Sequence, residues 1–173
     1  MQGKKKGIRA KTIITSHLNA DYDAIAAMLA AQKLYPEALI IFPGSQEKNL
    51  REFFISSMSY LFNMADPASI DFTDTRTLVL VDTRQKNRLL GVNDLLKNKQ
   101  VAIHVYDHHP PGPDDVTADM EVCKPYGATA TILSEILQEK NIVPTPEEAT
   151  VMALGIYEDT GMFTHASTTR ADF

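Results

Sequence analysis

The sequence contains one cysteine and no tryptophan in 173 residues. A lone Cys123 excludes an intrachain disulfide and a zinc site built on several thiolates. Because Cys123 follows Val122 in a predicted strand, we expect a small buried residue there, with a ligand role as the alternative. No apolar run approaches the length of a membrane span. There is also no basic excess, since 17 Lys and Arg against 22 Asp and Glu give a net charge of −5. That balance argues against a broad surface that coats nucleic acid.

Several motifs of other enzyme classes are missing as well. The chain has no Walker loop, no G-x-G-x-x-G and no G-x-S-x-G, so a P-loop, dinucleotide or serine-nucleophile enzyme is disfavoured. Residues 1–9 are basic but lack the apolar segment of a secretory signal, and we expect a cytoplasmic protein. Residues 1–11 are predicted to form a basic tail. Its lysines, Lys4 to Lys6, would be solvated or would form an arm that binds RNA or phosphate.

What the sequence does contain is an alternation of strands and helices. Strands are predicted over residues 12–16, 39–42, 77–81 and 101–106, with short ones at 69–72 and 119–123. Helices are predicted over residues 24–35, 49–62, 128–140 and 145–157, with one or two short helices within 87–98. This alternation predicts an α/β domain over residues 12–173, with a mostly parallel sheet of about five strands and helices on both faces. Because residues 167–173 resemble a helix start, we expect a segment of a longer protein.

The most informative stretch is an apolar strand that ends in Asp107, His108 and His109. An acid and two imidazoles at that point place metal-ligand groups at the carboxyl end of a strand, where open α/β sheets build their sites. Histidines buried in a core are the alternative. Two adjacent histidines beside an aspartate favour a site.

Three further groups of acids follow predicted strands or helices. They are His17, Asp21 and Asp23 in the spacing H-x-x-x-D-x-D, Asp82 after strand 77–81, and Asp159 after the last long helix. Each group has a simpler alternative: a solvated turn for the first, a helix N-cap for Asp82, and a polar helix exit for Asp159. We expect all four clusters to converge at one edge of the sheet.

Such a set of carboxylates and imidazoles suits Mn²⁺ or Mg²⁺ better than a structural zinc ion. Its size suits two ions about 3.5–4 Å apart, which clamp the attacking and leaving oxygens of a phosphoryl displacement. We therefore expect two divalent metal ions, with Mn²⁺ favoured over Mg²⁺. Carboxylates packed this closely should also titrate abnormally when no metal is bound.

The order of these motifs resembles the DHH phosphoesterase superfamily over roughly Ile13 to His165. The matching segments are H-x-N-x-D-x-D, a strand ending in Val-Asp-Thr, Asp-His-His and Gly-Ile-Tyr-Glu-Asp-Thr-Gly. The superfamily includes RecJ-like exonucleases, oligoribonucleases, inorganic pyrophosphatases and exopolyphosphatases. Details such as Tyr-Glu-Asp-Thr-Gly resemble the DHH domains at the front of bacterial proteins that carry CBS modules and a poly(A) polymerase or tRNA nucleotidyltransferase domain.

The resemblance implies a role for each metal-ligating residue. One metal would be bound by His17 and Asp21, and the other by Asp23 and His108. Both metals would be bridged by Asp82 and Asp159.

The resemblance also implies contacts to a phosphate substrate. His109 would face the phosphate, with Asp107 orienting the imidazoles, and Asn19 would contact substrate or the nucleophilic water. Gly127 to Thr129, at a helix start, would form a phosphate-side loop. Nothing in the chain corresponds to the second domain that closes over substrate in this superfamily, so we expect the domain alone to hydrolyse weakly or not at all.

Two functional hypotheses follow. The first is a metal-dependent phosphoesterase domain that acts on RNA ends, oligonucleotides or small phosphate compounds. The second is a regulatory or RNA-positioning domain of a nucleotidyltransferase, with little hydrolysis of its own. A plain α/β scaffold whose acids only cap helices is the remaining alternative. In the first two cases we expect further domains as partners, no membrane contact, and an oligomer as an open option.

Overall fold

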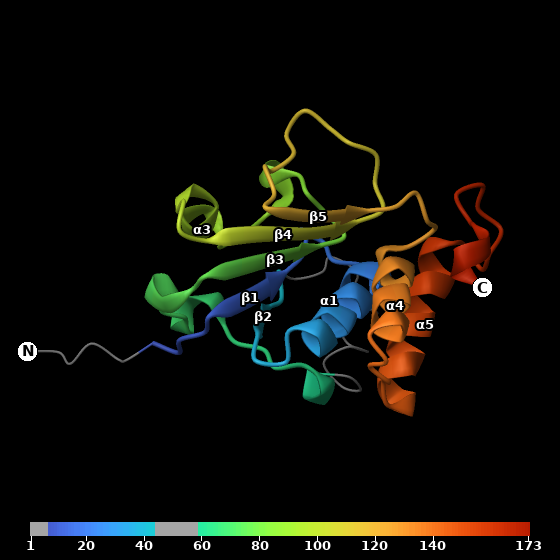
Figure 1. The fold of residues 1–173 in the computed structure, drawn as a ribbon, viewed down its shortest axis with the longest axis horizontal. Helices are drawn as coiled ribbons and strands as arrows, with labels where there is room; N and C mark the ends of the chain where they lie inside the picture. Colours follow the sequence, from blue (N-terminus) through green and yellow to red (C-terminus); the bar gives the residue numbers. More distant parts are fainter. Residues whose placement is uncertain (1–6, 44–58) are drawn as a thin grey trace, which may run out of the picture.

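The fold is built on one sheet of five parallel strands in the order β2-β1-β3-β4-β5 (Figure 1). The computed structural model describes residues 7–43 and 59–173. The strands are β1 (Thr12–Thr15), β2 (Leu39–Ile41), β3 (Thr77–Val81), β4 (Ala102–Asp107) and β5 (Met120–Cys123). The main helices are α1 (Tyr22–Leu34), α3 (Asn93–Lys97), α4 (Thr129–Glu139) and α5 (Pro146–Asp159).

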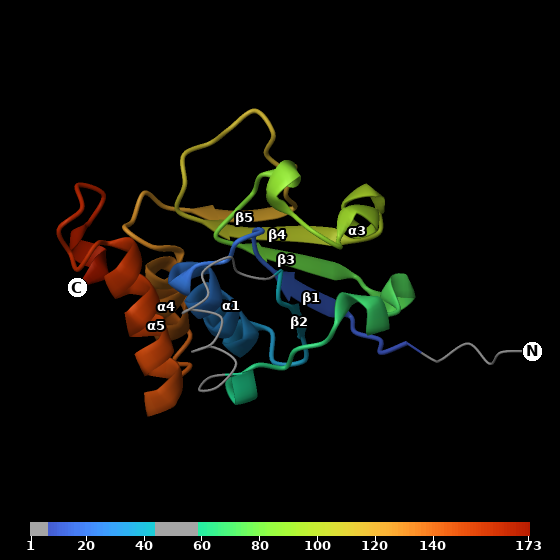
Figure 2. The same cartoon turned by 180° about the vertical axis from the view of Figure 1, so that it is seen from behind.

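Helices cover both faces of the sheet, and the central strand β3 shows why its sequence is wholly apolar. Successive side chains of a strand point to opposite faces. Val79 and Val81 therefore pack in the core beneath α1, α4 and α5, while Leu78 and Leu80 pack with Leu95 of α3 on the other face. The three longer helices lie together on one side of the sheet (Figures 1 and 2). The predicted α/β class is confirmed.

The strand order reverses between β1 and β3. The chain leaves β1 towards β2 on one side and later returns to the other side of β1 as β3. Ligand sites of open α/β sheets form outside the carboxyl ends of the strands where the order reverses in this way. The loop after β1 and the loop after β3 both open onto this point.

Helix α1 is buried on nearly all sides because it lies between the sheet and α5. Asp21 caps its start by accepting the N–H of Ala24 at 2.9 Å. Every residue from Asp23 to Ala31 is buried, and the many alanines keep the helix narrow. On α5, Gly155 faces α1 so closely that an added Cβ would lie 2.5 Å from the Cβ of Ala26.

The start of α5 follows its sequence signal. Thr145 accepts the N–H of Glu148, the Glu148 carboxylate accepts the N–H of Thr145, and Pro146 occupies the first turn. This is the predicted capping box. In the part of the chain that the structure describes, no helix has both the length and the apolar character needed to cross a bilayer.

Two local predictions are wrong. The predicted strand 69–72 is replaced by two 3₁₀ turns, Pro67–Ser69 and Phe72–Asp74, because Asp66 and Asp71 each accept a backbone N–H two residues ahead. Cys123 is exposed rather than buried, because β5 is an edge strand with one covered face.

Two further predictions fall at the limits of the described residues. The predicted helix 49–62 lies outside them up to residue 58; beyond it, Ser59–Leu61 forms a 3₁₀ turn and Phe62 packs in the core. Lys4 to Lys6 lie outside them too. Ile8, within the predicted tail, pairs with Ile70, so backbone pairing begins before Thr12.

Candidate metal centre

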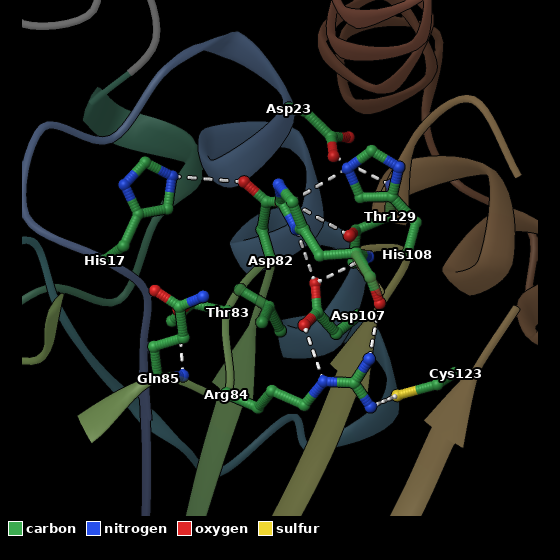
Figure 3. A network of polar contacts seen from close by, with 12 residues as sticks. His17, Asp23, Asp82, Thr83, Arg84, Gln85, Asp107, His108, Cys123 and Thr129 are labelled. Carbon is green, nitrogen blue, oxygen red and sulfur yellow. Dashed lines mark hydrogen bonds and ion pairs between the residues drawn. The ribbon is translucent and has the colours of Figure 1, made fainter. Parts of the chain in front are cut away.

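The predicted acids and imidazoles meet at the carboxyl edge of the sheet. The ligand atoms form three groups, and within each group they lie within 4.8 Å of one another. The groups are His17, Asp21 and Asp82; Asp23, His108 and Asp159; and Asp82, His108 and His109. The groups share Asp82 and His108, so they form one continuous cluster. Figure 3 shows Asp82 between His17 on one side and His108 with Thr129 on the other.

Asp82 is the residue that joins the cluster. It follows β3 and is buried, and its backbone has a positive φ of 57°. One carboxylate oxygen lies 3.1 Å from His17 Nε2, and the other accepts the Thr129 hydroxyl at 3.0 Å and lies 3.5 Å from His108 Nε2. A left-handed backbone is unfavourable for a residue other than glycine and is typical of functional sites. The alternative helix N-cap is excluded, because Gln85 occupies that position before the next turn.

The charge on Asp82 is stabilised by its neighbours. Burial opposes ionisation, but the hydrogen bond and charge of His17 and the charges of His109 and His108 lower the pKa of Asp82 below its usual value. A carboxylate held in its charged form inside the protein is a suitable metal ligand.

The first motif supplies His17 and Asp21. His17 is buried, and its Nε2 lies 3.9 Å from Asp21 Oδ2. Asp21 uses Oδ1 to cap α1, which leaves Oδ2 directed at His17. Burial, and then the charge of Asp82, raises the pKa of Asp21. One oxygen of Asp21 thus fixes the helix, and the other remains for an ion.

Asp23 is in the first turn of α1, and its buried side chain contacts the start of α4. Its two carboxylate oxygens accept the N–H groups of Thr129 at 2.7 Å and Ala130 at 2.9 Å, which are among the unpaired donors of a helix start. Burial, followed by the charges of Asp82 and Asp159, raises the pKa of Asp23 well above its usual value. The carboxylate is held in place, and no lysine or arginine among the described residues pairs with it.

His108 and Asp159 face each other across the same space. His108 Nδ1 lies 3.0 Å from the Tyr126 carbonyl oxygen, so an N–H there leaves Nε2 free to bind a metal. Nε2 lies 3.3 Å from Asp159 Oδ2. That oxygen is buried and accepts no hydrogen bond from the described residues. Burial, with the nearby carboxylates of Asp82 and Asp21, raises the pKa of Asp159 to about 6.

His109 is the more exposed imidazole of the pair. Of the two imidazoles, Asp107 contacts only that of His109. Asp107 Oδ1 lies 2.8 Å from His109 Nδ1, whereas His108 is oriented by Tyr126. The hydrogen bond with Asp107 raises the pKa of His109 against the effect of burial. His109 has a side chain 41% exposed, so it is the imidazole that solvent or a substrate can reach.

The buried Arg84 holds this pair in place and was missed by the sequence reasoning. Its Nε lies 3.4 Å from Asp107 Oδ2 and 3.2 Å from Asp115 Oδ2, and its guanidinium donates to the His109 carbonyl oxygen. It also donates to Cys123 Sγ at 3.1 Å (Figure 3). Its position two residues past Asp82 was the available signal, and its polar neighbours Thr83 and Gln85 made that signal weak.

The N–H groups of the predicted phosphate-side residues donate to carboxylates of the chain. Gly127 donates its N–H to Asp172, and the Thr129 N–H is used by Asp23. Both groups therefore support carboxylates of the chain itself. Asn19 is exposed and has a positive φ of 67°.

The residues fit divalent metal ions on their own chemistry. Four aspartates and three imidazoles converge, and hard or borderline divalent cations prefer these donors. The Oδ2 atom of Asp159 is buried and accepts no hydrogen bond from the described residues, so a bound cation would give it a partner.

Several known proteins are similar to this chain in sequence. Residues 11–156 match the DHH family, N-terminal domain. The A-adding tRNA nucleotidyltransferase of Geobacter sulfurreducens is 42% identical over 161 residues, which cover 93% of this chain and 18% of that protein. The manganese-dependent inorganic pyrophosphatase of Methanocaldococcus jannaschii is 28% identical over 170 residues, covering 92% of this chain and 51% of that protein.

A solved structure shares the fold. An exopolyphosphatase-related protein from Bacteroides fragilis aligns with a TM-score of 0.65 at 18% identity, over 92% of this chain and 49% of that chain. This chain thus spans only part of each relative. The match over residues 11–156 shows that the chain belongs to the DHH family and carries its N-terminal domain.

Proposed function

We propose that the chain is a phosphoesterase domain that uses two divalent metal ions, Mn²⁺ foremost, to hydrolyse phosphodiester or phosphoanhydride bonds. The observation that supports this proposal most strongly is the cluster of three ligand groups that share Asp82 and His108. Bound ions there would supply an acidic water and neutralise the charge of a phosphoryl group.

The proposed ligands divide between two positions. His17 and Asp21 would hold one ion, Asp23 and His108 would hold the other, and Asp82 and Asp159 would contribute to both. The groupings of ligand atoms support the shared role of Asp82, which is in one group with His17 and in another with His108. Asp159 is grouped with Asp23 and His108 only, so its contact with the first ion rests on the family resemblance.

His109 and Asp107 act beside the metals in this proposal. His109 faces outward at the edge of the cluster, and Asp107 keeps its Nδ1 protonated through their 2.8 Å contact. In the neutral ring Nε2 then accepts a hydrogen bond; in the charged ring it donates a proton to a phosphoryl or leaving oxygen. We leave Gly127 and the backbone of Thr129 out of the phosphate contacts, since Asp172 and Asp23 occupy their N–H groups.

The test is hydrolysis of bis(p-nitrophenyl) phosphate and of pyrophosphate in Mn²⁺ by a longer protein that contains this domain, since we expect the domain alone to hydrolyse weakly or not at all. We expect activity that disappears in Asp82→Ala and in His108→Ala, because each removes a ligand that two groups share. Asp94→Ala is the matched control, since Asp94 is exposed on α3. Activity that survives both ligand substitutions would overturn the proposal.

A second function is favoured by the 42% identity to a tRNA nucleotidyltransferase. In a longer protein of that kind, the domain would position RNA while another domain adds nucleotides. Nucleotide addition by such a protein, measured with and without Asp82→Ala, separates the two roles. Unchanged addition together with lost hydrolysis supports the phosphoesterase.

A further inference from the structure

Arg88 lies beside His17, one of the proposed metal ligands, and is not itself among the proposed site residues. It ends the 3₁₀ turn Lys86–Arg88 that follows β3 and Asp82. Its carbonyl oxygen accepts the Leu18 N–H at 2.8 Å, which ties this turn to the loop after β1. Its guanidinium Nη2 lies 2.8 Å from His17 Nδ1. The backbone thus fixes the arginine next to a proposed ligand.

The guanidinium of Arg88 has no carboxylate partner among the described residues. Arg84, in contrast, contacts Asp107 and Asp115, and Arg9 contacts Asp71. A partly buried arginine beside an acidic cluster would ordinarily pair with one of its acids. Here it contacts an imidazole instead, and none of the residues 7–43 and 59–173 accepts a hydrogen bond from its remaining N–H donors.

The contact between Arg88 and His17 depends on which nitrogen of His17 carries the proton. Nδ1 lies 2.7 Å from the Leu18 carbonyl oxygen and 2.8 Å from Arg88 Nη2. It can donate to the carbonyl or accept from the arginine, but not both. A neutral imidazole that binds a metal through Nε2 must carry its proton on Nδ1. Metal binding at His17 therefore directs Nδ1 to Leu18 and releases the N–H of Arg88.

The position of Arg88 also reaches the outward side of the cluster. His17 Nε2 lies 3.1 Å from one oxygen of Asp82, and His109 Nδ1 lies 3.8 Å from the other. Asp82 thus links the imidazole that Arg88 contacts to the exposed imidazole of His109. A phosphoryl group between these imidazoles would lie within reach of its charge.

We propose that Arg88 binds a phosphoryl oxygen of the substrate once His17 has bound its metal. A guanidinium presents N–H donors in a planar fork that matches a phosphate, and it remains charged at all relevant pH values. This inference rests on the proposed function and adds a positive group from this domain to the substrate side of the site.

The experiment measures two affinities by calorimetry, that of the chain for Mn²⁺ and that of the Mn²⁺-loaded chain for inorganic phosphate. In Arg88→Gln we expect unchanged Mn²⁺ affinity and about tenfold or more weaker phosphate binding, since a charged hydrogen bond is lost. Arg88→Lys should recover part of the phosphate affinity. Arg76→Gln, an exposed arginine before the start of β3, is the control for the loss of charge and should bind phosphate as the wild type does.

The outcomes separate the inference from the proposed function. Equal phosphate binding by wild type and Arg88→Gln overturns the inference alone. An equal loss of Mn²⁺ and phosphate affinity also overturns it, because Arg88 would then only support His17. A wild-type chain that binds no Mn²⁺ overturns both. Thermal melts of the three variants show that each is folded.

Discussion

The contact between α1 and α5 makes Gly155 a sensitive position for the metal centre. The two helices carry Asp23 and Asp159, so their spacing sets the separation of these carboxylates. A Cβ at position 155 would lie 2.5 Å from the Cβ of Ala26 and 3.0 Å from the carbonyl oxygen of Tyr22. Neither atom can rotate away, so Gly155→Ala must push the helices apart.

Two opposing terms give the size of the effect. Overpacking of a core costs about 1–3 kcal/mol, and contact with backbone favours the upper end. Alanine is better than glycine in a helix interior by about 1 kcal/mol. We expect a net loss of about 2 kcal/mol, or about 4–8 °C in melting temperature for a chain of this size.

Urea unfolding and Mn²⁺ titration provide the assay for Gly155→Ala. Mn²⁺ affinity should fall with stability, because Asp23 and Asp159 are moved apart. Ala153→Gly, an exposed site on the same helix, calibrates the helix-propensity term alone. A Gly155→Ala protein as stable as the wild type would refute the packing argument.

Three further predictions concern charge. In EDTA, the free energy of unfolding should fall from pH 5 to pH 8. Burial raises the pKa of Asp159 from its ordinary value near 3.8 to about 6 in the folded protein, so the stability that this gives is complete below pH 3.8 and is lost as the pH rises through 6. Mn²⁺ should reverse the trend, and greater stability at pH 8 in EDTA would contradict the prediction. Asp172→Ala should lower the free energy of unfolding in urea by about 3 kcal/mol, because the buried Gly127 N–H and the Thr131 hydroxyl lose their acceptor. Asp172→Asn should lower it by less, and equal losses in the two variants would refute the hydrogen-bond explanation. Arg84→Met should destabilise by about 3 kcal/mol, since it removes the guanidinium that faces Oδ2 of the buried Asp107. A variant as stable as the wild type in the same assay would show that this ion pair contributes nothing.

The sequence predicted the strands that carry the site because each combines an apolar run with a polar end. Asp82 and His108 follow β3 and β4 for this reason, and parallel strands bring their carboxyl ends to one edge. The family resemblance then grouped the distant motifs. The identity of the clustered side chains was therefore accessible without coordinates.

The supporting contacts were not accessible in the same way. The contact of Asp172 with Gly127 joins residues 45 positions apart through the path of the last loop, and no periodic pattern encodes such a path. The same holds for Arg84 and Arg88, whose contacts depend on how the turn after β3 folds back. Cys123 was mispredicted because an apolar neighbour does not reveal that a strand lies at an edge.

The most direct test of the metal centre is anomalous diffraction at the manganese edge from crystals grown with Mn²⁺. We predict two peaks per chain, one beside His17 and Asp21 and one beside Asp23 and His108, with Asp82 in contact with both. Crystals that bind no manganese at Asp82 would contradict the account.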